Sequence, residues 1–228
     1  MNNHVIQLQQ VQFRWTRQGS DILNIPTVDI QQGQHVFIYG KSGCGKTTLL
    51  NLIAGIHRPQ VGTVEVLNTN LNLLSATRRD QFRADHFGII FQQFNLLPYL
   101  SVLENVLLPC YFSAKRKSKA GKYIQTALRL LDELQIAENQ IHQSIQKLSV
   151  GQQQRIAVAR ALIGQPEIII ADEPTSALDA DNQQRFIELL FTEAQQQNST
   201  VIFVSHDLQL ARSFSTVLEL SAFNQATI

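Results

Sequence analysis

A glycine-rich segment near the start of the chain has residue types and a spacing suited to binding phosphate. The segment GKSGCGKT follows the apolar run HVFIY and precedes TLLNLIAGI, so we expect a loop between a strand and a helix. Glycines let successive backbone N–H groups converge on phosphate oxygens, and the helix N-terminus adds the positive end of its dipole. A plain glycine-rich turn would not need this spacing between these flanks. The predicted loop comprises Gly40, Lys41, Ser42, Gly43, Cys44, Gly45, Lys46, Thr47 and Thr48.

Four side chains could supply the chemistry of a bound nucleotide. Lys46 would neutralise charge on the β- and γ-phosphates, and Thr47 would offer its hydroxyl to Mg²⁺. Asp172 and Glu173 follow the apolar run IIIA, residues 168–171, and precede a proline, which places them at the carboxyl end of a predicted strand. There Asp172 would hold Mg²⁺ through water and Glu173 would polarise an attacking water as a general base. A surface Asp-Glu pair before a proline turn is the alternative, and the strand pattern in front of the pair argues against it.

The elements that must position these side chains are predicted from hydrophobic periodicity. Strand-like and helical patterns alternate along most of the chain, which favours a largely parallel sheet. The middle, from Gln93 to about Ile163, is mostly helical and we interpret it as an insertion. The expected strands are VIQLQQVQF, HVFIY, TVEVL, FGIIF, EIIIAD, TVIFVSHD and STVLEL, and the expected helices include TTLLNLIAGI, YIQTALRLLDELQI and QQRFIELLFTEAQQ.

Composition limits the class of protein and its partners. The 228 residues, 44% hydrophobic and 16% charged, suit one folded domain or a domain with a subdomain. A formal net charge of +1 gives no general attraction to nucleic acid. The start MNNHVIQLQQ does not resemble a signal peptide, and no run approaches the roughly 18 apolar residues of a membrane span, so we expect a cytosolic chain. Cys44 and Cys110 lack metal-ligand spacing and are interpreted as structural.

The stretch LSVGQQQR, residues 148–155, places hydroxyl and amide groups directly before the apolar helix pattern IAVARALIG. It resembles the LSGGQ hallmark of the ATP-binding cassette (ABC) ATPases. The other motifs stand in that family's order along nearly the whole chain: GKSGCGKTT, Gln92 after FGIIF, LSVGQQQR, IIIADEP, SALD and VSHD. Taken alone, His206 would more often be a structural histidine and Gln92 a solvated loop residue.

The resemblance implies a fold. It implies an α/β, P-loop NTPase (RecA-like) core with an antiparallel β subdomain and an inserted helical subdomain. The whole chain, 1–228, would be a single ABC ATPase domain. Its core would span 1–92 and 163–228, and the helical subdomain that carries the signature would span about 93–162.

The resemblance also implies a head-to-tail homodimer that sandwiches two ATP molecules. Ser149, Gly151 and Gln152, at the start of a helix, would bind the γ-phosphate of the nucleotide held by the opposite subunit. His206 would contact the γ-phosphate and position water together with Glu173.

Three further residues take roles from the same resemblance. Gln92 would sense Mg²⁺ and the water and link the site to a membrane partner. Asp179 would couple the two sites. Trp15, at the end of the first strand, would stack on adenine, with a core or surface tryptophan as the alternative.

Val150 departs from the family pattern, which usually has glycine there. A β-branched residue resists positive φ and adds bulk beside phosphate. Either the position has an ordinary backbone conformation or hydrolysis is impaired. We favour the ordinary conformation because Ser149, Gly151 and Gln152 are retained.

The run AKRKSKAGK, residues 114–122, is the densest basic stretch. It could touch anionic lipid headgroups, but such a run is more often a solvated helix start. It lacks the interleaved aromatics that stack on bases, so no nucleic-acid partner is expected.

The segment FGIIFQQFNLLPYLSVLENVLLP resembles the cassettes of lipoprotein-releasing, macrolide-exporting and cell-division systems. This implies a prokaryotic protein, peripheral on the cytoplasmic face of the inner (plasma) membrane, with a separate integral membrane permease as partner. The expected function is a Mg²⁺-dependent ATPase that drives an exporter or transmits force across the membrane, with ATP and Mg²⁺ as cofactors. The alternative is an ATP-gated switch that acts through a membrane partner on an extracytoplasmic protein and carries no cargo. A soluble translation ATPase would need tandem cassettes or a long coiled-coil insertion.

Overall fold

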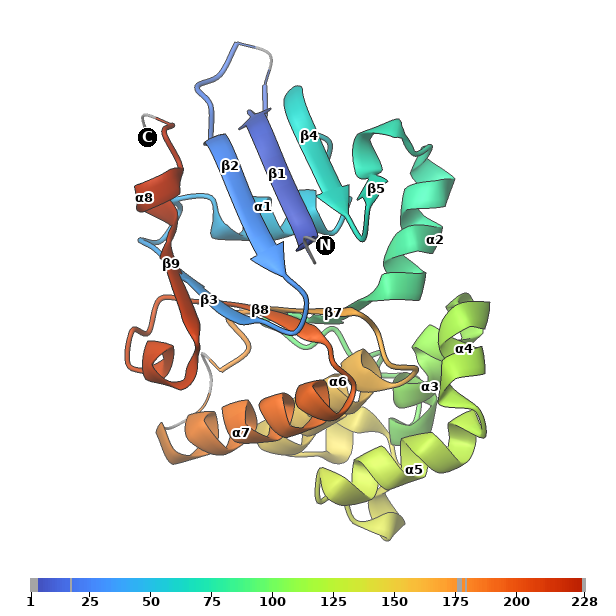
Figure 1. Ribbon diagram of the computed structural model, residues 1–228. Coiled ribbons are helices and arrows are strands. Elements are labelled where there is room, and N and C mark those ends of the chain that lie inside the picture. Colours follow the sequence, from blue (N-terminus) through green and yellow to red (C-terminus); the bar gives the residue numbers. More distant parts are fainter. Residues whose placement is uncertain (1–3, 17, 176–177, 179, 227–228) are drawn as a thin grey trace. The chain divides into compact units, whose positions relative to one another are not determined.

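The computed structural model describes residues 4–16, 18–175, 178 and 180–226. The chain forms two compact units. The first unit comprises Met1–Arg83 and Thr200–Ile228, and the second comprises Ala84–Ser199. Each unit contains strands and helices (Figure 1).

The first unit contains an antiparallel sheet in the strand order β2-β1-β4-β5. Its central strand β1 alternates buried and more exposed positions, and Ile6, Leu8 and Val11 are fully buried. This alternation is typical of a strand with one face on a core. The strands are β1 (His4–Phe13), β2 (Leu23–Gln31), β4 (Val61–Val66) and β5 (Thr69–Asn70).

Parallel strands form the second element of the first unit. Strand β3 (His35–Tyr39) pairs in parallel with both β8 (Thr200–Ser205) and β9 (Thr216–Glu219). Every residue of β8 is buried, which explains why its sequence is almost continuously apolar. Phe37 and Phe203 stack with ring centroids 6.0 Å apart. Helix α1 (Lys46–Ile53) follows β3 through the glycine-rich loop.

The second unit combines two parallel strands with most of the helices. Strand β6 (Phe87–Ile90) pairs with β7 (Ile168–Asp172). Helices α3, α4 and α5 pack against one another (Figure 1). The helices of this unit are α3 (Val102–Phe112), α4 (Ala114–Ala120), α5 (Tyr123–Glu133), α6 (Val150–Leu162) and α7 (Ala180–Gln196). The remaining elements are α2 (Ala76–His86), α8 (Leu220–Phe223) and the 3₁₀ helices Leu71–Leu73, Glu138–Gln140, Ile145–Lys147 and Leu210–Ser213.

The predicted α/β class with an antiparallel β part and a helical part is confirmed. The subdomain boundaries at residues 92 and 163 stay predictions. Within the described residues, no helix combines the length and apolar character needed to cross a membrane.

The basic run forms helix α4, and three of its cations, Lys115, Arg116 and Lys119, make hydrogen bonds or ion pairs with other parts of the second unit. Arg116 is buried and donates to the carbonyls of Phe87, Ala161 and Ile163. Lys115 and Lys119 both donate to Glu167, at 3.0 and 2.8 Å. The run therefore serves the packing of its own unit.

Glu167 binds Lys115, Lys119 and His86. His86 Nδ1 lies 3.1 Å from its second oxygen. Burial opposes charge on Glu167, yet the hydrogen bonds from His86, Lys119 and Lys115 hold the pKa of this carboxyl well below its usual range. Glu167 is therefore ionised, and it ties α4 to the start of β7.

A carboxyl pair lies between α5 and α7. Glu193 is only 3% exposed and lies close enough to Glu133 for the two carboxyls to affect each other's charge. Arg129, one turn before Glu133, donates to both of its carboxylate oxygens at 2.6 Å. Burial, and then the neighbouring Glu133, raise the pKa of Glu193 from 4.5 to about 7.

Replacing Arg116 with leucine should lower the free energy of unfolding by about 3 kcal/mol, because the carbonyls that the guanidinium satisfies lose their buried donor. Urea denaturation monitored by circular dichroism measures this change. Lys117→Met is the matched control on the same helix: Lys117 is exposed and lies over the ring of Tyr123, a contact worth about 0.5–1 kcal/mol. Equal losses in the two variants would contradict the anchoring role of Arg116.

The Glu193 carboxyl makes stability depend on pH. The unfolded chain releases this proton near pH 4.5, whereas the folded chain keeps it until about pH 7. Between these values the folded state binds more protons, so stability falls as pH rises through the window. Glu193→Gln should therefore be more stable than the unchanged protein by about 1–2 kcal/mol at pH 8, with a smaller difference at pH 5. Urea denaturation at both pH values measures the difference, and a gain of equal size at pH 5 and pH 8 would exclude this explanation.

Candidate functional site

The loop between β3 and α1 has a backbone that requires glycine. Gly43 and Gly45 have φ of 80° and 104°, in the left-handed region. A Cβ added at Gly45 would lie 3.0 Å from Leu23 Cδ2 and 3.2 Å from Ile22 Cγ2. At Gly40 an added Cβ would lie 2.7 Å from Cys44 Sγ. Side chains at these positions would therefore distort the loop.

The N-terminus of α1 faces this loop. Gly45 is the N-cap and has no side chain to offer the first N–H groups, and the first turn contains no acidic residue. Those N–H groups and the helix dipole therefore favour an anion.

Lys46 lies within the curve of the loop. The residue is only 8% exposed, and its ammonium donates to the carbonyls of Gly40 at 2.8 Å and Lys41 at 3.2 Å. Thr47 is exposed and Thr48 is buried. The predicted phosphate loop thus gathers a cation, helix N–H groups and a hydroxyl in one short segment.

His206 leaves the sheet beside this loop. Tyr39 and Ser205 are opposite each other in the parallel pair β3–β8, so Gly40 and His206 follow at the same edge. His206 is exposed. The turn after it is fixed by Ser205 Oγ, which accepts from Asp207 N at 3.1 Å.

Trp15 follows β1 and is 59% exposed. Its ring packs edge-on against Phe13 and His57, with centroids 5.1 and 5.0 Å apart. Phe13 and His57 also stack on each other at 5.6 Å. This cluster holds an exposed aromatic ring in place, and its stacking on adenine stays a prediction.

The carboxylates and Gln92 lie in the second unit. Ile90 and Ala171 are opposite each other in the parallel pair β6–β7, so Gln92 and Asp172 follow at one edge. Gln92 is exposed, and Asp172 and Glu173 are half-buried.

Glu173 has an unusual backbone. Its φ is 47°, a left-handed conformation that costs a non-glycine residue about 1–2 kcal/mol. Such a conformation persists only where neighbouring contacts hold it. The carbonyl of the next residue, Pro174, accepts from Gln154 Nε2 on α6 at 3.0 Å.

Gln154 had no role assigned from sequence. It shares a helical face with Ala157, Val158 and Ala161, all of them buried. A polar residue at a core position of a helix must find a partner, and that was the signal available in the sequence. Arg160, on the same helix, also had no role assigned from sequence. It donates to the carbonyls of Phe94 and Asn95.

The signature begins helix α6 with a capping box. Ser149 Oγ accepts from Gln152 N at 3.3 Å, and Gln152 Oε1 accepts from Ser149 N at 2.9 Å. Val150 is the first helical residue and is not among the residues with positive φ, so the expected ordinary conformation is confirmed. An added Cβ at Gly151 would meet nothing within 4 Å.

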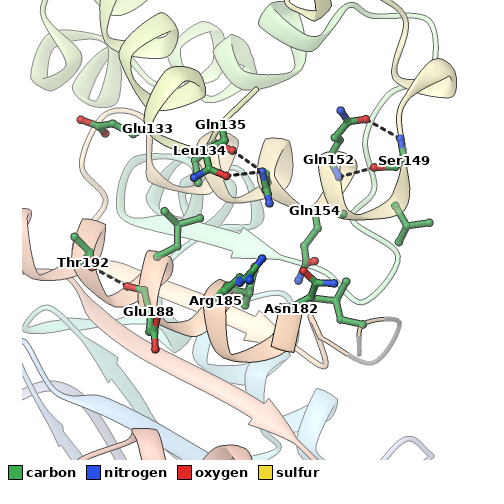
Figure 2. A pocket seen from close by; sticks show the side chains of 16 residues that line it. Glu133, Leu134, Gln135, Ser149, Gln152, Gln154, Asn182, Arg185, Glu188 and Thr192 are labelled. Carbon is green, nitrogen blue, oxygen red and sulfur yellow. Dashed lines mark hydrogen bonds between the residues drawn. The ribbon is translucent and has the colours of Figure 1, made fainter. Parts of the chain in front are cut away.

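A cavity of about 780 Å³ opens beside the signature. Its walls come from the end of α5, the start of α6 and α7 (Figure 2). Ser149, Val150, Gly151 and Gln152 all line it, so the structure brings the predicted signature residues to one surface. Arg155 also lines the cavity and donates to Leu134 O and Gln135 Oε1, both at 3.4 Å.

The predicted metal ligands have suitable chemistry. Thr47, Asp172 and Gln92 offer hydroxyl, carboxylate and amide oxygens, the hard donors that Mg²⁺ takes. Among the described residues no cluster of three His, Cys, Asp or Glu could hold an ion by itself. Phosphate oxygens would have to complete such a site. Asp179 lies outside the described residues.

Comparison with known proteins gives consistent matches. The family model described as ABC transporter matches residues 23–176. The uncharacterized ABC transporter ATP-binding protein MJ0796 of Methanocaldococcus jannaschii is 38% identical over 85% of this chain and 82% of its own length. A structure of MJ0796, described as a dimeric post-hydrolysis state bound to ADP and Pi, has a TM-score of 0.81 and 34% identity, covering 94% of this chain and 93% of that one.

Two bacterial relatives have more specific names. The lipoprotein-releasing system ATP-binding protein LolD of Saccharophagus degradans is 36% identical over 90% of this chain and 88% of its own. The macrolide export ATP-binding/permease protein MacB of Pasteurella multocida is 36% identical over 96% of this chain, but only 33% of MacB is covered.

The glycine requirement of the loop can be tested by substitution. Gly45→Ala should lower the free energy of unfolding by about 1–3 kcal/mol, because alanine resists the φ of 104° and its Cβ would press on Leu23. Thermal unfolding measures this effect. Gly151→Ala is the matched control: it lies in α6 with open space around it and should be stabilising by up to about 1 kcal/mol. A neutral Gly45→Ala would show that the loop can relax.

Proposed function

The chain belongs to the ABC transporter family as an ATP-binding cassette, and from that premise we propose that it is the ATP-hydrolysing motor subunit of a membrane exporter. The observation that carries this proposal is the loop at the start of α1, where a buried ammonium lies inside a turn of glycines. A polyphosphate suits such a loop, because the N–H groups and Lys46 supply positive charge within one short segment.

We propose separate roles for the residues around the nucleotide. Lys46 offsets the charge of the β- and γ-phosphates, and Glu173 accepts a proton from the attacking water. His206 orients that water and contacts the γ-phosphate. Mg²⁺, held by Thr47 and Asp172 with Gln92 nearby, would neutralise charge on the phosphate oxygens. Trp15 would stack on the adenine.

The signature suits a second nucleotide, held by another copy of the chain. Ser149, Gly151 and Gln152 lie at the start of a helix beside an open cavity, and Gly151 has open space around it for a phosphate. The MJ0796 cassette, which is dimeric in a post-hydrolysis state bound to ADP and Pi, supports a homodimer. Asp179 would couple the two sites.

The names of the relatives support a membrane partner. LolD is named for a lipoprotein-releasing system, and MacB is named as both ATP-binding protein and permease. We propose that this cassette docks, in a prokaryote, on the cytoplasmic side of a separate membrane subunit, through the segment that follows Gln92. The alternative is an ATP-gated switch that works through such a subunit on an extracytoplasmic protein.

Replacing Glu173 with glutamine tests the enzymatic role. Loss of the base should slow phosphate release about 100-fold or more, while ATP binding persists and an ATP-bound dimer accumulates. A phosphate-release assay and light scattering with ATP measure both effects. Glu138→Gln, at an exposed position in a 3₁₀ helix, is the control and should keep normal turnover. Unchanged turnover in Glu173→Gln would remove the proposed base.

The same Glu173→Gln protein, captured with ATP from native membranes, identifies the partner by mass spectrometry. A four-helix membrane subunit with a large extracytoplasmic domain would support the exporter group. Copurifying cell-wall proteins would instead favour the switch. A many-helix permease with a solute-binding protein would mean an importer and would contradict the proposal.

A further inference from the structure

Helix α6 joins the signature to two loops of its own protomer that carry reaction residues. We infer that Gln154 and Arg160 are positioning residues through which α6 couples the nucleotide at the partner's site to Glu173 and Gln92 of its own chain. This inference rests on the proposed function, because it requires ATP at the signature and hydrolysis through Glu173.

Gln154 holds the loop that follows β7. Its side chain is 2% exposed, and its Nε2 donates to the carbonyl of Pro174 at 3.0 Å. Pro174 comes directly after Glu173, whose φ is 47°. The Glu173 conformation is strained, so a fixed point one residue away determines where the carboxylate lies.

Arg160 holds the loop that follows β6 in the same way. Its guanidinium donates to the carbonyl of Asn95 at 2.7 Å and to that of Phe94. Both residues have positive φ, 57° at Phe94 and 47° at Asn95. Gln92 lies two residues before this strained turn. Helix α6 is therefore hydrogen-bonded to a strained backbone segment close to Gln92 and to another close to Glu173.

The helix between these contacts is rigid enough to transmit a displacement. From Gln152 to Leu162 it contains no glycine or proline, and the capping box fixes its first turn. At a rise of about 1.5 Å per residue, Gln154 lies roughly 8 Å and Arg160 roughly 17 Å along the axis from Ser149. A tilt of α6 when phosphate binds its N-terminus therefore moves both carbonyl contacts.

Gln183 offers a matched comparison. Its Nε2 also donates to carbonyls of the loop after Glu173, those of Thr175 at 3.2 Å and Leu178 at 3.3 Å. Gln183 belongs to α7, however, and does not connect this loop to the signature. Replacing each glutamine with methionine removes one amide donor at similar side-chain length. Gln154→Met removes the hydrogen bond between α6 and the loop after Glu173, whereas Gln183→Met removes the hydrogen bonds between α7 and the same loop.

The test measures ATP turnover as a function of ATP concentration in the full chain. Gln154→Met should lower kcat about tenfold or more, leave KM within about threefold, and reduce the Hill coefficient of the unchanged protein toward 1. The Gln154→Met/Glu173→Gln double variant should still form the ATP-bound dimer, because phosphate binding at the signature is intact. Gln183→Met should keep the Hill coefficient.

A normal kcat and Hill coefficient in Gln154→Met would overturn the inference, and so would an equal loss of both in Gln183→Met. If Gln154→Met does not fold, Arg160→Lys replaces it: lysine keeps the charge but does not bridge two carbonyls, and it should give the same selective loss of kcat and cooperativity. If the unchanged protein hydrolyses no ATP, or Glu173→Gln forms no dimer, the proposed function itself fails.

Discussion

The first N–H groups of a helix have no carbonyl partners within the helix, and at α1 the N-cap residue, Gly45, has no side chain to supply one. Much of the first unit follows from this constraint. The loop needs left-handed glycines so that its N–H groups can converge. It begins directly after Tyr39, where β3 ends. Lys46 lies within the loop and donates to the carbonyls of Gly40 and Lys41. Phosphate is the ligand class that satisfies such an arrangement.

In the second unit, two arginine side chains supply hydrogen-bond donors to backbone carbonyls. Arg116 and Arg160 both donate to carbonyls, and burial lowers the pKa of each to about 10, so each remains a cation at neutral pH. Arg116 joins the end of α6 to the start of β6, whereas Arg160 fixes the turn of Phe94 and Asn95. These contacts give several backbone carbonyls of the second unit a charged hydrogen-bond donor.

Local patterns were predictable from the sequence, and distant contacts were not. The strand, loop and helix around Lys46 could be predicted because glycine spacing and apolar periodicity are local signals, and an ordinary backbone at Val150 followed from the chemistry of valine. The roles of Gln154 and Arg160 were missed because their partners lie 20 and 65 or more residues away in the sequence. The basic run was interpreted as a solvated helix start, since the carboxylate that binds it, Glu167, is equally remote.

The capping box at Ser149 and Gln152 also bears on how two cassettes could associate and separate repeatedly. The capping box orders the first turn of α6 before a partner is present. The free energy of association would therefore not include the cost of ordering this turn. The same property would limit the affinity of the proposed dimer for nucleotide, because a phosphate would have to compete with the hydroxyl of Ser149 for the N–H group of Gln152. In the proposed homodimer, a preordered helix with an internal competitor for its N–H group would suit an interface that forms and separates repeatedly.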